Sequence, residues 1–174
     1  SINSADLTGI SYTQSSGNLV IPLPTPGSVV LTPAVAAYTL TCTSGDIVVV
    51  GHLAAGDGGG APADLVLNAP AGTVYVQGSI STGNRDFTYD GDPAGSLQIF
   101  ANRIVITGEL FAAGEAGGGD GGAVTLAAAG GANPDVVVAG GRVLTSGGLN
   151  DAGSGGAGGA VTILAIFNGL GRPS

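Results

Sequence analysis

The sequence predicts an all-β protein, a single-stranded right-handed parallel β-helix (β-solenoid) of about four to five rungs. Three observations predict this fold. One pattern of residues recurs about every thirty positions, as in the segments Thr39–Gly56 and Leu65–Gly83. Apolar and polar residues alternate within each copy, which is the period of a β-strand. Glycines close corresponding strands, and no window has the apolar spacing of an amphipathic helix.

The phase of the repeat can be followed at the last large apolar residue of the first strand in each copy. Five such residues, which are 27, 32, 27 and 37 positions apart, are expected to stack in one column: Leu40, Leu67, Ile99, Leu126 and Ile163. The spacing varies because surface segments absorb insertions while the strands must stay in step. The right-handed sense is expected from the strong bias of parallel crossover connections.

Each copy is expected to contribute three short strands. In the copy that begins at Leu65, the side chains of Leu65, Leu67 and Ala69 would face inward, whereas Val66 and Asn68 would face outward. The second strand of each copy ends at a glycine, at Gly51, Gly78, Gly108 and Gly140. A glycine at the same phase of every copy predicts a bend or a close approach of two backbones there.

The composition excludes several classes of partner. The chain has 174 residues, 34 glycines and a net charge of −8, and its Lys and Arg residues number only four. Such a surface cannot replace the counterions of nucleic-acid phosphates, nor can it bind an anionic membrane surface by charge. No apolar run has the length of a transmembrane segment. Small and β-branched residues suit the narrow interior of a coiled sheet.

The first 36 residues are a different kind of sequence. We interpret residues 1–36 as an extended N-terminal cap or arm and residues 37–174 as the solenoid. Short strands are expected at Leu7–Thr13 and Leu19–Leu23, and Val29–Leu31 is expected to be an incomplete opening rung.

The chain begins at Ser1 without a methionine, which we interpret as the result of signal-peptide removal from an extracellular or cell-surface protein. The single cysteine, Cys42, cannot form an intrachain disulfide. Cys42 shares its phase with Ala69 and Ala101, so we expect a small inward-facing apolar side chain. An intermolecular disulfide or a reactive thiol is the alternative.

The repeat also resembles known proteins. Alternating apolar strands, punctuating glycines and turns such as the Gly-Gly-x-Gly-Gly segment that begins at Gly118 resemble the β-helices of secreted bacterial surface proteins of the filamentous-haemagglutinin and adhesin type. The resemblance covers Ala37 to Phe167 and implies a β-helix at the cell surface. It brings no family active site with it.

Catalysis is not expected. The outward positions of the first strands offer no paired carboxylates, and the chain lacks the lysine that many β-helix lyases and hydrolases use. His52, the only histidine, takes the outward position that Ser79 and Glu109 hold in later copies. We expect His52 to be exposed and to have no nucleophile in phase, so no catalytic triad is predicted.

Two glycine-rich segments raise the question of calcium. Gly56–Gly60 and Gly117–Gly122 each contain one aspartate and are loosely similar to the calcium-binding repeats of toxin-type β-rolls. One carboxylate per turn is few for the about six to eight oxygen ligands that calcium takes. We therefore expect no cofactor, with a structural calcium ion as the alternative.

The open ends of a solenoid are rows of unpaired backbone groups that must be capped or used. We therefore expect a structural protein that assembles with copies of itself, head to tail, into a surface filament or sheath. The residues expected at this contact are Leu19, Ile21, Leu23, Val161, Ile163, Ile166 and Phe167. One alternative is a monomeric adhesin or carbohydrate-binding module, in which Phe87 and Tyr89 stack on cell-surface glycans. A polysaccharide-active enzyme is the second alternative.

Overall fold

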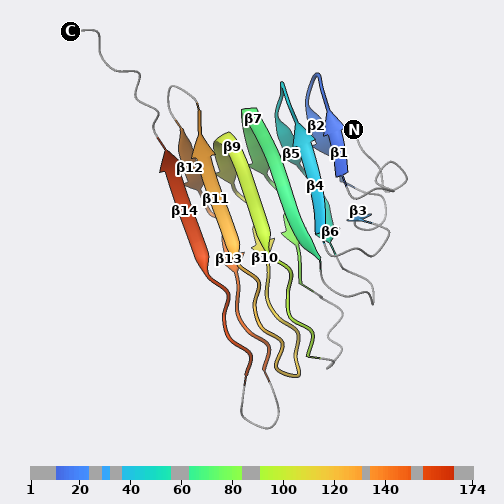
Figure 1. The fold of residues 1–174 in the computed structure, drawn as a ribbon, viewed down its shortest axis with the longest axis vertical. Coiled ribbons are helices and arrows are strands. Elements are labelled where there is room, and N and C mark those ends of the chain that lie inside the picture. Colours follow the sequence, from blue (N-terminus) through green and yellow to red (C-terminus); the bar gives the residue numbers. More distant parts are fainter. Residues whose placement is uncertain are drawn as a thin grey trace, which may run out of the picture.

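The computed structural model describes residues 11–23, 29–31, 37–55, 63–83, 91–130, 134–149 and 155–166. These residues form strands and turns, and there is no helix among them. The strands are parallel and stack as a β-solenoid of about four turns (Figure 1). The predicted fold class is therefore confirmed.

The strands belong to two sheets. The larger sheet contains β1 (Ser11–Gln14), β2 (Leu19–Ile21), β4 (Ala37–Cys42), β5 (Ile47–Val49), β7 (Asp64–Val76), β9 (Leu97–Ile106), β11 (Val124–Ala129), β12 (Asp135–Val138) and β14 (Val161–Ile166). The smaller sheet contains β3 (Val29–Leu31), β6 (His52–Ala55), β8 (Ser79–Ser81), β10 (Glu109–Phe111) and β13 (Arg142–Leu144).

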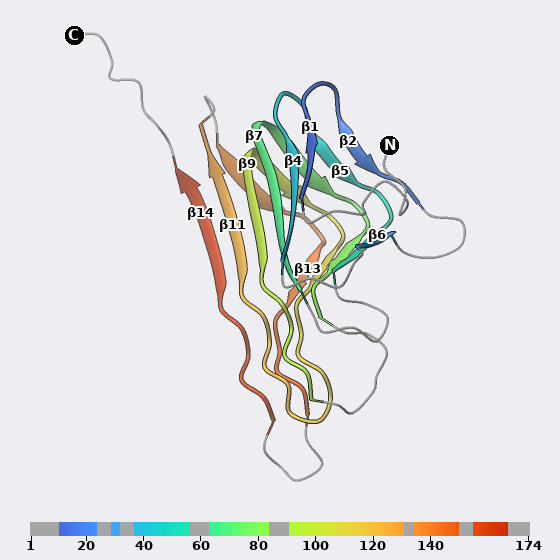
Figure 2. The same cartoon turned by 45° about the vertical axis from the view of Figure 1, so that its right-hand side comes forward.

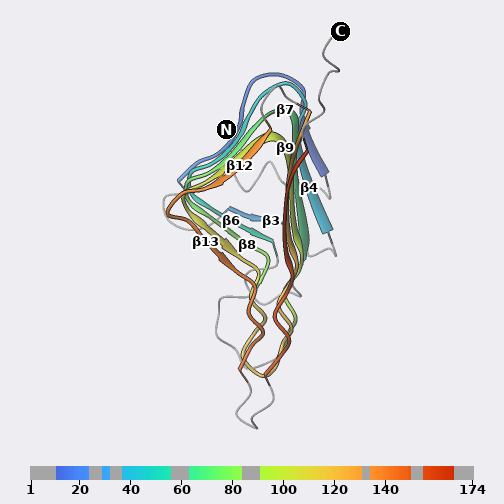
Figure 3. The same cartoon turned by 90° about the vertical axis from the view of Figure 1, so that its left-hand side faces the viewer.

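The coil has three sides, which are seen end-on in Figure 3. One side is a ladder in the order β1-β4-β7-β9-β11-β14. The long strands β7 and β9 continue past a corner, where their second halves pair with β5 and β12 on the next side. The smaller sheet, in the order β13-β10-β8-β6-β3, closes the third side. The core lies between these sides.

The five residues that were predicted to stack do form one column. Pairing is continuous through Leu40, Leu67, Ile99, Leu126 and Ile163. The first four are at most 2% exposed, and burying each such side chain contributes about 1.5–3 kcal/mol. Ile163, in the last strand, is 54% exposed.

Glycine is required where the second strand ends in two of the copies. A Cβ atom on Gly78 would lie 1.9 Å from the carbonyl oxygen of Gly51, and one on Gly108 would lie 1.7 Å from that of Gly78. The backbones of successive turns are thus in direct contact, as the repeated glycine predicted. In the next copy Gly140 has open space around it and a φ of +75°, and Gly141 makes the close approach to Gly108 instead.

The N-terminal segment continues the coil. Strands β1, β2 and β3 pair in parallel with β4, β5 and β6. Among the described residues, the two sheets therefore extend before residue 37, through β1, β2 and β3. Leu19 and Ile21 are each 0% exposed, because even a three-residue strand joins the ladder when two inward side chains complete the core.

Glycine-rich segments form a thin extension of the coil, which we call the fin: residues 91–96, 112–123, 145–149 and 155–160. The fin is the narrow lower part of Figure 3, beyond β10 and β13. These segments lie on one edge of the solenoid. They are more than connecting loops, because they form two hydrogen-bonded layers.

Backbone hydrogen bonds hold the fin together in two directions. Between its layers, the Gly122 amide donates to the Ala112 carbonyl at 2.8 Å. Between successive turns, the Ala112 amide donates to the Leu144 carbonyl, also at 2.8 Å. A Cβ atom on Gly122 would lie 2.0 Å from the carbonyl oxygen of Gly95. Successive turns of the fin can approach this closely only because glycine has no side chain.

Polar side chains join successive turns at the corner between the first two sides. The Asn18 Oδ1 atom accepts the Asp46 amide at 3.0 Å, and the Asp46 Oδ1 atom accepts the Thr73 amide at 2.7 Å. The corner interrupts the regular ladder, so these side chains satisfy backbone groups that would otherwise lack a partner.

We expect Gly78→Ala to destabilise the protein by about 3 kcal/mol or more, because its Cβ atom would overlap a backbone carbonyl that cannot move without breaking the ladder. Urea unfolding followed by circular dichroism measures the change. Gly158→Ala is the matched control, since the nearest atom to its Cβ is 3.5 Å away. Equal stability of the two variants would contradict the close-approach argument.

We expect Asp46→Ala to lower the free energy of unfolding by about 1–2 kcal/mol, because the Thr73 amide loses its acceptor. Asp46→Asn keeps an Oδ1 acceptor in the same place, so its stability should stay within about 0.5 kcal/mol of the wild type. Thermal and urea unfolding of the three proteins compare these values. A similar loss in both variants would show that charge, not the hydrogen bond, matters.

Candidate functional site

The C-terminal edge, residues 155–166, is the first candidate site. In the described chain β14 pairs with β11 on one side and ends the sheet on the other (Figure 2). Its large apolar side chains are about half exposed: Val161 46%, Ile163 54%, Leu164 44% and Ile166 48%. Three of these, Val161, Ile163 and Ile166, were predicted as assembly residues.

Two of the exposed side chains continue the inward columns of the core. Val161 and Ile163 pair with Val124 and Leu126, which are 0% exposed. No further turn covers Val161 and Ile163 among the described residues. Water therefore contacts apolar surface that is buried in the preceding turns, and covering it is favourable by about 25 cal/mol per Å².

The edge also lacks the features that normally prevent strand addition. Between Gly155 and Ile166 the sequence contains no charged residue and no proline. β14 pairs with β11 at six consecutive positions without a bulge. An edge that is flat, uncharged and apolar is the kind that pairs with another strand.

The N-terminal edge is short and polar by comparison. Strand β1 has the sequence Ser-Tyr-Thr-Gln. The Nε2 atom of Gln14 donates to the carbonyl oxygens of Ser16 and Asn18, at 3.0 and 2.8 Å. The last side chain of this edge strand is therefore bonded to its own turn. The two ends of the described coil are chemically unequal.

The N-terminal residues predicted to contact a neighbour divide into two groups. Leu19 and Ile21 lie in the core and have no exposed surface, whereas Leu23 is 70% exposed. Of these three residues, only Leu23 is therefore accessible for a contact. The remaining predicted residues, Phe167, Phe87 and Tyr89, lie outside the described residues.

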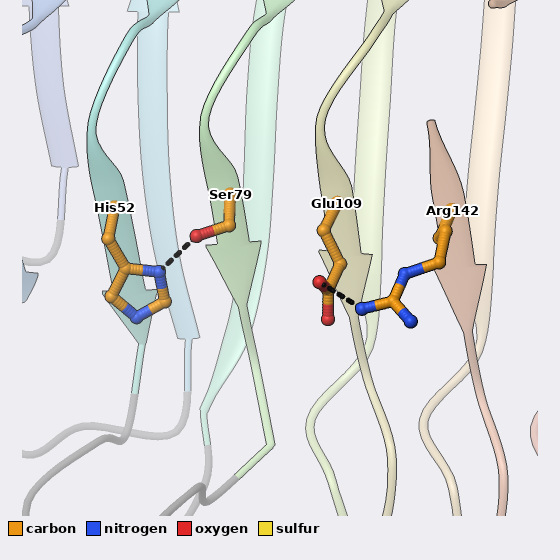
Figure 4. A network of polar contacts seen from close by, with 4 residues as sticks. All are labelled: His52, Ser79, Glu109 and Arg142. Carbon is orange, nitrogen blue, oxygen red and sulfur yellow. Dashed lines mark hydrogen bonds and ion pairs between the residues drawn. The ribbon is translucent and has the colours of Figure 1, made fainter. Parts of the chain in front are cut away.

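The smaller sheet carries a column of polar side chains on its outer face (Figure 4). Parallel pairing aligns His52, Ser79, Glu109 and Arg142. The Nδ1 atom of His52 lies 2.6 Å from the Ser79 Oγ atom, and Arg142 donates to Glu109 Oε2 at 2.7 Å. The Arg142 side chain is 67% exposed, so this ion pair contributes at most about 1 kcal/mol to stability.

The contact between His52 and Ser79 corrects one expectation, because the sequence analysis gave His52 no nucleophile in phase. Each turn of the coil repeats the same positions. Outward side chains at equivalent positions of successive turns therefore come within hydrogen-bond distance. Ser79 lies between His52 and Glu109, so within this column the carboxylate does not face the imidazole. A catalytic triad has the imidazole between the hydroxyl and the carboxylate, and the column has a different order.

Acidic side chains of the fin serve its own structure. Glu115 is 3% exposed, and its Oε2 atom lies 3.4 Å from the Asp92 amide. Nothing in the sequence signalled its burial, which depends on how the fin layers pack. Asp120, from the segment considered for calcium, accepts the Ala157 amide at 2.7 Å. Within the described ranges, no three His, Cys, Asp or Glu side chains converge as metal ligands.

Cys42 is buried, as its phase predicted. The side chain is 0% exposed, and its thiol donates to the Gly17 carbonyl oxygen at 3.2 Å. Burial removes the thiol from contact with a second molecule, so the alternative of an intermolecular disulfide loses its physical basis in this conformation.

A groove on the outer face of the larger sheet is the second candidate site, and we call it the Phe100 slot. It crosses β7, β9, β11 and β14 where these strands reach the corner, and its volume is about 470 Å³. The side chains that define it are Asn68, Phe100, Ala127, Ala129, Leu164 and Ile166. Asn68 was predicted to face outward, but the hollow at Ala127 could not be predicted from the sequence.

Comparison with known proteins gives no relative from which a function could be transferred. No protein-family model matches the chain, and no curated protein or solved structure matches it. None of the residues that the structure describes belongs to a helix long and apolar enough to cross a membrane.

Proposed function

We propose that this chain is an extracellular structural protein, a β-solenoid unit that associates head to tail with copies of itself into a surface filament or sheath. The observation that carries the proposal is the C-terminal edge, which is open, uncharged and apolar. No catalytic step is part of this role. The extracellular location is supported by the resemblance of the repeat to secreted surface β-helices.

Strand addition at the C-terminal edge would provide backbone hydrogen bonds and also cover exposed apolar side chains. A strand from a neighbouring copy would pair with the backbone groups of β14 that face away from β11. The same strand would cover Val161 and Ile163, which continue the core columns. Each whole chain carries a net charge of −8, so two chains repel each other. Because residues 155–166 have no charge, the contact itself brings no like charges together.

The direction of assembly follows from the parallel register. If the N-terminal turn of the next copy stacks on β14, each addition repeats the same step along the axis. A contact between two different surfaces that does not close generates a filament. Leu23, which is exposed on the N-terminal turn, would then be covered, while Leu19 and Ile21 support that turn from within.

We expect Ile163→Lys to weaken self-association at least about tenfold, because an ammonium group would have to enter an apolar contact without a partner. Ile163 is half exposed in the single chain, so the variant should keep its fold. Light scattering after size-exclusion chromatography, over a range of concentrations, measures association. Negative-stain electron microscopy shows whether the wild-type particles are filaments.

Two matched variants test whether the contact between two chains is head to tail. Leu149→Lys makes the same change at a residue of the fin that is 84% exposed, and it should assemble as the wild type does. Leu23→Lys should weaken association as Ile163→Lys does if the contact is head to tail. Discrete dimers that are sensitive to Ile163→Lys alone would overturn the filament. A wild-type chain that stays monomeric at every concentration would overturn self-assembly altogether.

A further inference from the structure

The hollow of the Phe100 slot arises from one small residue in an otherwise bulky column. Pairing aligns Asn68, Phe100, Ala127 and Leu164 on the outer face. Ala127 therefore lies between a phenyl ring and a leucine side chain. Phe100 is 37% exposed and Leu164 is 44% exposed, so both walls face solvent and neither is needed to fill the core.

The strand spacing sets the width of the slot. Phe100 and Leu164 are two strands apart, which corresponds to about 9.6 Å between their backbones. Side chains stand roughly perpendicular to a sheet. A ring that touches both walls at van der Waals distance needs about 7–8 Å between them. The slot therefore has room for one ring edge-on over Ala127.

The chemistry of the lining is neutral. None of the lining residues is charged, and Asn68 supplies the only polar side chain. The amide of Asn68 can both donate and accept a hydrogen bond, which is the pairing that adjacent hydroxyl groups offer. We propose that the Phe100 slot binds a neutral glycan, with the C–H face of one pyranose ring on Phe100 over Ala127 and hydroxyl groups of the adjoining sugar on Asn68, which lies on the other side of Phe100.

Other ligand chemistries fit less well. An anionic sugar would meet no cation in the slot and would approach a chain whose net charge is −8. A hydrocarbon chain would cover the Asn68 amide without offering it a hydrogen bond, which costs about 1–3 kcal/mol. A glycan presents apolar ring faces and polar edges together, so it satisfies both parts of the slot.

This site overlaps the assembly contact only at Leu164 and Ile166. Asn68, Phe100 and Ala127 lie on β7, β9 and β11, away from the C-terminal edge. Leu164 and Ile166 belong to both surfaces, and they contribute one wall of the slot. Glycan binding and self-assembly can therefore be tested with different variants, and the failure of one does not imply the failure of the other.

Isothermal titration calorimetry of the full chain tests the proposal with cellohexaose, chitohexaose, mannohexaose and maltohexaose as probes. We expect saturable binding of at least one probe with a Kd below about 1 mM. Ala127→Leu fills the slot and should abolish that binding. Phe100→Ala should weaken it at least about tenfold, and Asn68→Ala about fivefold. All three side chains face outward, so unchanged melting temperatures confirm that the fold is intact.

Gln98→Ala is the matched control, because Gln98 faces outward in the next column of β9 and does not line the slot. Its affinity should equal that of the wild type. Hexagalacturonate and 1-decanol test the charge and hydrocarbon arguments, and neither should compete with the bound probe. The proposal is wrong if no neutral probe binds, if Ala127→Leu leaves binding unchanged, or if either competitor displaces the glycan.

Discussion

Parallel hydrogen bonding between successive turns is the constraint on which the rest of this structure depends. β7 and β9 pair at nine positions on both sides of a corner, with one register shift between Ala69 and Thr73. A slip of one residue would exchange the inner and outer faces of a strand, so the inward residues must recur at a fixed phase. The same stacking presses backbone against backbone at Gly78 and Gly108, where a Cβ atom has no room.

The two ends of the hydrogen-bonded ladder differ in the described chain. At the N-terminal end, the inward residues Leu19 and Ile21 are covered and the Gln14 side chain bonds to its own turn. At the C-terminal edge, the inward residues Val161 and Ile163 remain about half exposed. The register that orders the core therefore also creates the apolar edge, because β14 keeps the inward pattern of its predecessors and no described residue forms a further turn over it.

The column from Leu40 to Leu126 and the glycine contacts were predictable, because both follow from the regular spacing at which the sequence pattern recurs. The short N-terminal strands were expected, but the pairing of β1 with β4 was not, because Tyr12 and Gln14 stand where the next turn carries Leu40 and Cys42. The two-layered fin was also missed, since glycine carries no side-chain pattern from which layers could be inferred. The candidate edge was predictable from its apolar sequence, whereas the Phe100 slot depends on which outward residues become neighbours across turns.

The outer face is where such a coil can acquire binding chemistry without loss of fold. Inward positions are fixed by packing, so a change there alters every adjoining turn. A residue at an outward position only has to fit beside the outward residues of the two adjacent strands. One outer column is polar, with His52 beside Ser79 and Glu109 beside Arg142. Another is apolar, with a hollow at Ala127. Each column rests on the parallel ladder of its own sheet, so the difference in their chemistry reflects the choice of outward side chains and not the demands of the core.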